Sequence, residues 1–203
     1  RQHAHQCAVA VVALAVEAGR ARRHAGSIAR QRAAGLDAYV EDLRAVLAQL
    51  NSRPVVVAST VGGWIAVQAL SSDAANLAAG LVLVDMPIRS AAEAARQISK
   101  SLPEDQPALD SRVIGAMDLG DVADSVLAAA PGLNLPTMVL RGGIAWVRHS
   151  PGAAEFDMAL PNAEVAKVDD AELLLVTDRT EALLAHLLDF LERKQPRHAN
   201  EFR

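Results

Sequence analysis

Short runs of aliphatic and β-branched residues alternate along this chain with longer stretches of helical period. Three of these runs are Val55–Ala58, Leu81–Asp85 and Leu135–Leu140. Apart from the final Asp85, each is almost continuously apolar, which is typical of a parallel strand that helices cover on both faces. The alternation therefore predicts the α/β class, with a mostly parallel sheet between two helical layers.

Two weaker runs and three amphipathic stretches complete the expected pattern. Val9–Val16 predicts the first strand of the chain, and Ala163–Val168 predicts the last. Helical spacing predicts a helix with Asp37 as its N-cap and with an apolar stripe made of Val40, Leu43, Val46, Leu47 and Leu50. Gly62-Gly63 opens a second predicted helix, Trp64–Leu70. The closing helix, Thr180–Arg193, is predicted to turn inward Leu183, Leu184, Leu187, Leu188 and Leu191.

The segment between the second and third buried runs is too long for a simple crossover. It is Ala-rich and has a Pro-containing break at Leu102-Pro103-Glu104. We therefore expect a small helical lid at about 89–131, within a single domain that spans residues 1–203.

Composition and charge exclude several classes of function. The 203 residues carry a net charge of −4, with Lys and Arg scattered, so nucleic acid is not an expected partner. The apolar run Ala8–Val16 is far shorter than the roughly 20 residues of a membrane helix, so no membrane association is expected. The single cysteine, Cys7, forms no internal disulfide and fits a reducing compartment, which predicts a cytoplasmic protein. The chain opens on Arg1 and enters this run almost at once, which we interpret as a processed, trimmed or incomplete N-terminus.

Residues 55–64, V-V-V-A-S-T-V-G-G-W, resemble the nucleophile elbow of α/β hydrolases, where G-x-S-x-G forms a turn between a strand and a helix. The likeness extends over residues 8–193, through the order and spacing of the later elements. Within this family the chain resembles the small esterases and the haloperoxidase-like members. The resemblance implies an α/β-hydrolase fold in which about a quarter or more of a typical single-domain hydrolase is absent at the N-terminal end.

The resemblance also implies where a catalytic Ser, acid and His would stand, and this chain has other residues there. The nucleophile position is Thr60, the acid position is Trp146 and the His position is Leu173. A β-branched Thr hinders attack from a strained turn, an indole cannot orient a His as an anion, and Leu offers no base. The triad is thus degenerate, which predicts a pseudoenzyme that has lost Ser-His-Asp hydrolysis.

Two interpretations of Thr60 stay open. It is either a structural residue or the nucleophile of a makeshift triad with His149 and Asp85. Asp85 follows the strand beside the elbow, where some relatives keep their acid, but such a residue commonly anchors loops instead. His149 is more often a solvated loop residue.

Metal and cofactor binding are not expected. The spacing His3-x-His5-x-Cys7 could bind a metal ion, but no fourth ligand is evident. The sequence therefore predicts neither a metal site nor a cofactor.

Two functions follow from these alternatives. In the first, the chain binds a small apolar acyl or ester-like ligand, or has an interaction role. The ligand pocket would be lined by Val61, Trp64 and Met86 together with the triad positions, and the Val61 amide would keep half of an oxyanion hole. The same side chains could instead be core filling. In the second, the chain is a weak carboxylic ester hydrolase that uses Thr60, His149 and Asp85.

The absent front part also affects the sheet. In the resembled fold, an absent strand lies between the first strand of this chain and the elbow strand. Either the first strand moves across to the elbow strand, or an exposed sheet edge invites homodimerisation.

Overall fold

A parallel four-stranded sheet forms the centre of the protein. The computed structural model describes residues 36–72, 74–86, 88, 119–142, 152–160, 162–169, 171 and 175–194. In these ranges the strands pair in the order β1-β2-β3-β4, which confirms the α/β class. Their bounds are Val55–Ser59 (β1), Gly80–Val84 (β2), Thr137–Arg141 (β3) and Ala163–Lys167 (β4). The strand predicted at Val9–Val16 lies outside the described residues.

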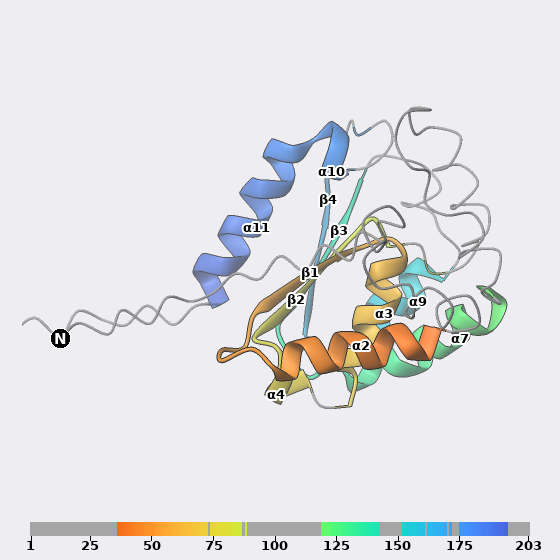
Figure 1. Cartoon of the computed structure of the whole chain (residues 1–203). Helices are drawn as coiled ribbons and strands as arrows, with labels where there is room; N and C mark the ends of the chain where they lie inside the picture. Colours follow the sequence, from red (N-terminus) through yellow and green to blue (C-terminus); the bar gives the residue numbers. More distant parts are fainter. Residues whose placement is uncertain are drawn as a thin grey trace, which may run out of the picture.

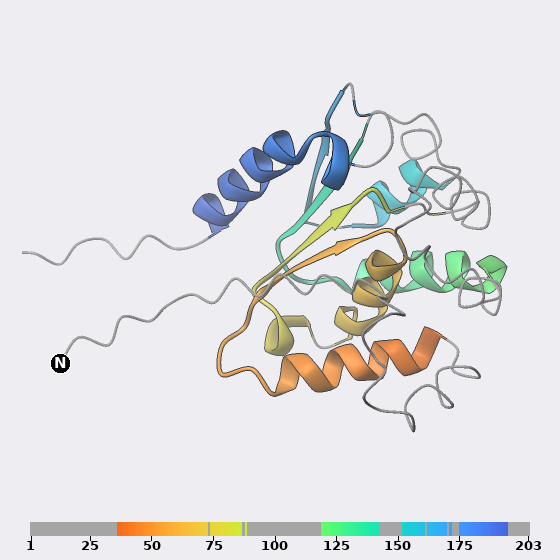
Figure 2. The same cartoon turned by 45° about the horizontal axis from the view of Figure 1, so that its top comes forward.

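Helices cover the two faces of the sheet (Figure 1). One face carries α2 (Leu36–Ala48), α3 (Val61–Leu70), α7 (Leu119–Ala129) and α9 (Ala153–Ala159). The opposite face carries α10 (Leu175–Asp178) and α11 (Thr180–Lys194), and the rotated view separates the two layers (Figure 2). A short helix, α4 (Ala74–Leu77), and a 3₁₀ turn, Ala130–Gly132, lie in the connections. No helix in the described ranges is both long and apolar enough to cross a membrane.

Alternation along the strands divides the core in two, because successive side chains of a strand point to opposite faces. Val56 and Ala58 of β1 pack in the cluster that contains α2 and α3. Val82 and Val84 of β2 pack in the second cluster, which contains α11 and includes Phe190. The central strands β2 and β3 are buried at every position, as expected for parallel strands between two helical layers.

The helix after the elbow, α3, is apolar on nearly all sides. It lies between the sheet and two neighbouring helices, so most of its side chains from Gly62 to Leu70 are buried. Its C-terminal end is held by Arg44 of α2, whose Nε donates to the Ala69 carbonyl at 2.8 Å and whose guanidinium also reaches the Gln68 carbonyl at 3.0 Å. A cation at this end satisfies carbonyls that lack intrahelical donors and complements the helix dipole.

Three predicted features of β1 and α2 need correction. β1 is not fully buried: Val55 and Val57 are only partly covered, because β1 is the edge of the described sheet. The helix α2 begins at Leu36, so Asp37 lies in its first turn and is not the N-cap. The predicted apolar stripe of α2 is also too wide and too long, since Val46 is 49% exposed and Leu50, 40% exposed, lies beyond the end of the helix at Ala48.

The inward face of α11 also differs from the prediction. Leu183 and Leu191 are buried as expected, but Leu184 and Leu188 are 48% and 58% exposed. Phe190, which the Leu pattern overlooked, is fully buried. The helix contacts the sheet along one narrow stripe of residues three, four and seven apart, and five leucines exceed the width of that stripe.

The end of the predicted insert belongs to the helical layer that covers the sheet. Val122 and Val126 of α7 are buried in the same cluster as α3, and a hydrogen bond joins Gln68 of α3 to Ser125 of α7. Within 89–131 the structure describes residues 119–131, and the rest lies outside the described residues. The sequence did not predict α9 or α10, whose short lengths leave little periodic signal.

Candidate functional site

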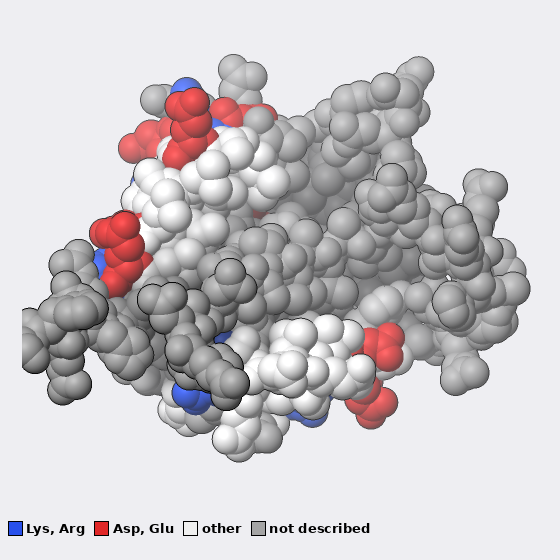
Figure 3. Space-filling view, turned by 60° about the vertical axis from the view of Figure 1, so that its left-hand side comes forward, with Lys and Arg blue, Asp and Glu red and all other residues white. Residues whose placement is uncertain are grey.

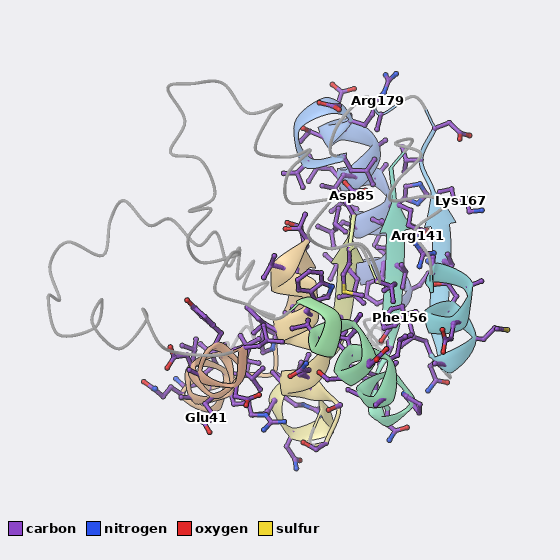
Figure 4. The ribbon with its side chains drawn as sticks, turned by 90° about the vertical axis from the view of Figure 1, so that its right-hand side faces the viewer. Glu41, Asp85, Arg141, Phe156, Lys167 and Arg179 are labelled. Carbon is purple, nitrogen blue, oxygen red and sulfur yellow. The ribbon has the colours of Figure 1, made fainter. Side chains whose placement is uncertain are left out.

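Three strands end at the same edge of the sheet and bring the candidate residues together. Thr60 follows β1, Asp85 follows β2, and Arg141 ends β3. Because all strands are parallel, their carboxyl ends meet at one edge, where open α/β sheets bind ligands. Figure 4 shows Asp85, Arg141 and Lys167 at this end of the strands.

Thr60 occupies a backbone conformation that β-branched residues rarely adopt. Its φ is 50° and its ψ is −121°, and its N–H donates to the Val84 carbonyl of the neighbouring strand at 3.2 Å. Its carbonyl accepts from the Gly63 N–H at 3.0 Å in the first turn of α3. This is the sharp strand-to-helix turn expected of a nucleophile elbow. The Thr60 hydroxyl makes no capping hydrogen bond to α3, so its oxygen is not committed to the helix.

The other ligand-binding candidates lie around this turn. Val61 is partly buried. Because it is the first residue of α3, its N–H is one of the amides that lack an intrahelical acceptor. Trp64 and Met86 are 2% and 3% exposed and belong to the hydrophobic core. A Cβ on Gly63 would lie 2.6 Å from the Met86 sulfur, so glycine here permits the close approach of α3 to the end of β2.

Asp85 holds together the backbone that follows β3 and the backbone at the start of α10. The side chain is 1% exposed. Its Oδ1 accepts from the Gly142 N–H at 2.7 Å, and its Oδ2 accepts from the Leu175 N–H at 2.7 Å. Asp85 itself has a positive φ of 48°. Any side chain at position 142 would crowd this contact, because a Cβ there would lie 3.0 Å from Oδ1.

Burial dominates the electrostatics of this carboxyl group. Desolvation raises the pKa of Asp85 above its usual value, and the charge of Asp178 raises it further. The hydrogen bonds from Leu175 and Gly142 favour the ionised form and oppose this rise, but they do not cancel it. The net result is a carboxyl group that prefers to keep its proton more than an exposed Asp does.

An ion pair between a buried arginine and a partly exposed aspartate lies beside this edge. Arg141, 3% exposed at its side chain, makes a bidentate contact with Asp157 of α9 through N–O distances of 2.7 Å and 2.6 Å. Paired donors in this geometry bind a carboxylate strongly and fix its orientation. The pair therefore fastens α9 to the end of β3, while the buried Arg141 Nε has no hydrogen-bond partner among the described residues.

The remaining predicted site residues cannot be placed. His149, Trp146 and Leu173 lie outside the described residues. The structure therefore brings Thr60 and Asp85 to adjacent strand ends but does not test the makeshift triad. No group of three or more side chains suited to a metal ion occurs within the described ranges.

Sequence reasoning missed the two backbone groups that bind Asp85. One signal was available: Gly142 follows a buried strand at the same edge as Asp85, which marks a close approach of backbone. No sequence signal identifies Leu175, because a backbone N–H is present at every residue except proline.

The described part of the chain has an α/β-hydrolase-like fold, as comparison with solved structures shows. An α/β hydrolase enzyme from the metagenome of sediments of the lagoon of Mar Chica, Morocco, superposes with a TM-score of 0.56 at 14% identity, over 79% of this chain and 71% of that one. A proposed non-heme bromoperoxidase from Mycobacterium tuberculosis H37Rv superposes with a TM-score of 0.58 at 19% identity, over 86% and 80%.

A CIB-like hydrolase predicted in Thermoplasma acidophilum gives a TM-score of 0.52 at 14% identity, and this chain covers 60% of its length. No family model matches the sequence, and no curated protein matches it either. At these identities the likeness establishes the fold, and it confirms the resemblance to α/β hydrolases that the elbow motif indicated.

Proposed function

We propose that this chain binds a small apolar acyl or ester-like molecule at the carboxyl ends of the strands and does not hydrolyse it through a Ser-His-Asp triad. The observation that carries this proposal is the double use of Asp85. Both of its oxygens already accept backbone hydrogen bonds, from Gly142 and from Leu175. A carboxylate held in this way serves the backbone and is poorly placed to orient a histidine as well.

The elbow supplies the polar part of the proposed binding site. The Thr60 hydroxyl can donate to a carbonyl oxygen, and so can the Val61 N–H at the start of α3, where the helix dipole favours partial negative charge. The nearby surface is apolar, since Val61 packs against the core that contains Trp64. A small ligand with one carbonyl group and a short hydrocarbon part fits this combination of groups.

The second candidate function is weak ester hydrolysis by Thr60, His149 and Asp85. The observation in its favour is the backbone of Thr60, which keeps an unusual conformation that a β-branched residue disfavours. Such strain costs about 1–3 kcal/mol and is most often retained at functional sites. In this scheme the Thr60 hydroxyl attacks the ester carbonyl while His149 takes its proton, and His149 then gives that proton to the departing alcohol. Water, with His149 again as the base, hydrolyses the acyl-Thr60 intermediate and restores the hydroxyl.

One set of variants distinguishes the two functions. We would measure hydrolysis of p-nitrophenyl acetate and p-nitrophenyl butyrate by the purified full chain, beside Thr60→Ala, Thr60→Ser and His149→Ala. Binding without turnover would be followed by NMR with butyramide, a carbonyl compound that resists hydrolysis. The proposal predicts no turnover above buffer, and butyramide binding that Thr60→Ser keeps and Thr60→Ala weakens.

The opposite result is equally clear. Turnover that both Thr60→Ala and His149→Ala abolish would replace the binding proposal with the hydrolase. Absence of both turnover and butyramide binding would exclude both functions for small acyl compounds. An exposed-residue variant, Asp42→Ala on α2, provides the control for handling and purity.

A further inference from the structure

We propose that the open edge of β1 and the apolar surface beside it bind residues 9–16 of this same chain as a fifth, parallel strand. Three features of the fold support this proposal: the direction of the β1 backbone groups, the flank that α11 turns towards β1, and the side of the sheet on which α2 lies.

The outer edge of β1 presents hydrogen-bonding groups in a fixed alternation. The Thr60 N–H donates to Val84 of β2. In a parallel ladder alternate residues bond to the same neighbour, so positions 56 and 58 also bond to β2. The N–H and C=O groups of Val55, Val57 and Ser59 therefore point away from β2, where no described strand pairs with them. Such an edge binds an extended segment readily.

An apolar surface lies beside this edge on the α11 side. Arg193 of α11 is tied to Glu164 of β4 by an ion pair of 2.6 Å, so that flank of the helix faces β4. Leu184 is nine residues from Arg193, which is two and a half helical turns, and thus lies on the opposite flank. That flank faces the β1 side, where Leu184 and Leu188 are 48% and 58% exposed.

The same surface continues onto β1 through side chains that the helix leaves partly uncovered. Val55 and Val57 contact the cluster beneath α11 but are only partly buried, whereas the central strand β2 is buried at every position. Figure 3 shows uncharged side chains next to acidic ones on the side of the molecule where α11 lies. A strand added to β1 would cover Val57 and Leu188 with one face of its own side chains.

The path of the chain indicates which strand belongs there. From β1 to β2 the connection runs through α3, and α2 packs against α3 on the same face of the sheet. Crossover connections between parallel strands are right-handed in about 98% of cases. A parallel strand that precedes α2 must then lie on the side of β1 away from β2. Residues 9–16 are the uncharged, β-branched run that precedes α2 in the sequence.

The chain's own segment also has an advantage over a second copy. It is tethered to α2 through residues 17–35, a connection long enough to reach from one end of a strand to the start of a helix. Tethering gives the segment an effective concentration of about millimolar, which exceeds that of a partner protein in dilute solution.

Hydrogen exchange in the full chain tests this proposal. We would measure exchange of the Val57 and Ser59 amides by NMR, together with the molar mass at several protein concentrations. The variants are Val11→Pro and Val12→Pro, with Ala21→Pro in the connection as the control. Adjacent N–H groups of a strand point to opposite sides, so only one of the two central prolines removes a donor that faces β1.

The proposal predicts a monomer in which Val57 and Ser59 exchange at least about tenfold more slowly than in the more disruptive of the two proline variants. Ala21→Pro should leave this protection unchanged, and amides of α11 should stay protected in all variants, which shows that the fold is intact. Rapid exchange of Val57 and Ser59 in the original chain would overturn the proposal. So would protection that both central prolines leave unchanged, or protection that accompanies a dimer and falls on dilution, since a second copy would then occupy the edge.

Discussion

Replacing Asp85 by Ala tests whether this residue is a structural anchor. The change removes both acceptors and leaves the N–H groups of Gly142 and Leu175 buried without partners. Each unsatisfied buried donor costs about 1–3 kcal/mol, so two donors cost about 2–6 kcal/mol. Part of this loss is offset, because burial disfavours the ionised form of Asp85, as its raised pKa shows, and the variant no longer buries that carboxyl group.

The expected net loss of unfolding free energy is therefore in the lower half of that range, about 2–3 kcal/mol. For a domain of this size, each kcal/mol shifts the melting temperature by about 2–4 °C, so the midpoint should fall by about 4–12 °C. Urea unfolding followed by circular dichroism gives the free energy, and a thermal scan gives the midpoint. Asp42→Ala, an exposed Asp of α2, is the matched control and should change stability by less than about 0.5 kcal/mol.

Two results would refute this reasoning. A loss of less than about 0.5 kcal/mol in Asp85→Ala would mean that the two backbone groups find other acceptors, so that Asp85 is not needed as an anchor. A stable Asp85→Ala variant that nevertheless loses ester turnover would instead assign Asp85 to the makeshift triad.

Three further predictions concern the same edge of the sheet. Because the pKa of Asp85 is raised, the folded state keeps a proton that the unfolded state releases above about pH 4. The contribution of Asp85 to stability should therefore fall as pH rises from that value to the folded pKa. Urea titrations of the original chain and of Asp85→Ala at several pH values give the difference in unfolding free energy, and a difference that grows with pH would contradict this prediction. Thr60→Gly should not destabilise the fold, because relief of about 1–3 kcal/mol of backbone strain offsets the greater freedom of glycine in the unfolded chain. A fall in the urea midpoint that corresponds to a loss of more than about 1 kcal/mol in unfolding free energy would show that Thr60 is not strained. Asp157→Ala should lower the unfolding free energy by about 3 kcal/mol, because it leaves the Arg141 charge buried without its partner, and the double variant with Arg141→Met should recover part of that loss. Equal losses in the single and the double variant would mean that the pair only fills space.

The sequence predicted the buried elements well because their patterns have one structural reading. The continuous apolar runs at β2 and β3 could only be strands within two helical layers, and both were confirmed. Prediction was poorer at partly exposed faces. Leu184 and Leu188 have the right residue type for the core, but a leucine pattern cannot show how much of a helix the sheet covers.

The candidate site was predictable to a similar extent. The turn at Thr60 followed from the spacing of Ala58, Thr60 and Gly62 between a strand and a helix. The double hydrogen bond of Asp85 could not be predicted, because its donors are backbone groups from segments 57 and 90 residues further along the chain. The bidentate pair of Arg141 and Asp157 was missed for a different reason, since the predicted strand ended at Leu140 and a buried charge is not expected within a strand.

The contacts of Asp85 bear on how this edge of the sheet can change during evolution. A carboxylate that binds main-chain amides places no demand on the neighbouring side chains, because every residue except proline offers the same donor. Position 175 can therefore accept most substitutions that suit its buried surroundings, whereas a side chain at position 142 would require Asp85 to shift, because its Cβ would lie 3.0 Å from Oδ1. The loops that begin at these positions can exchange their side chains, and with them their chemistry, while the point at which they attach to the sheet stays the same.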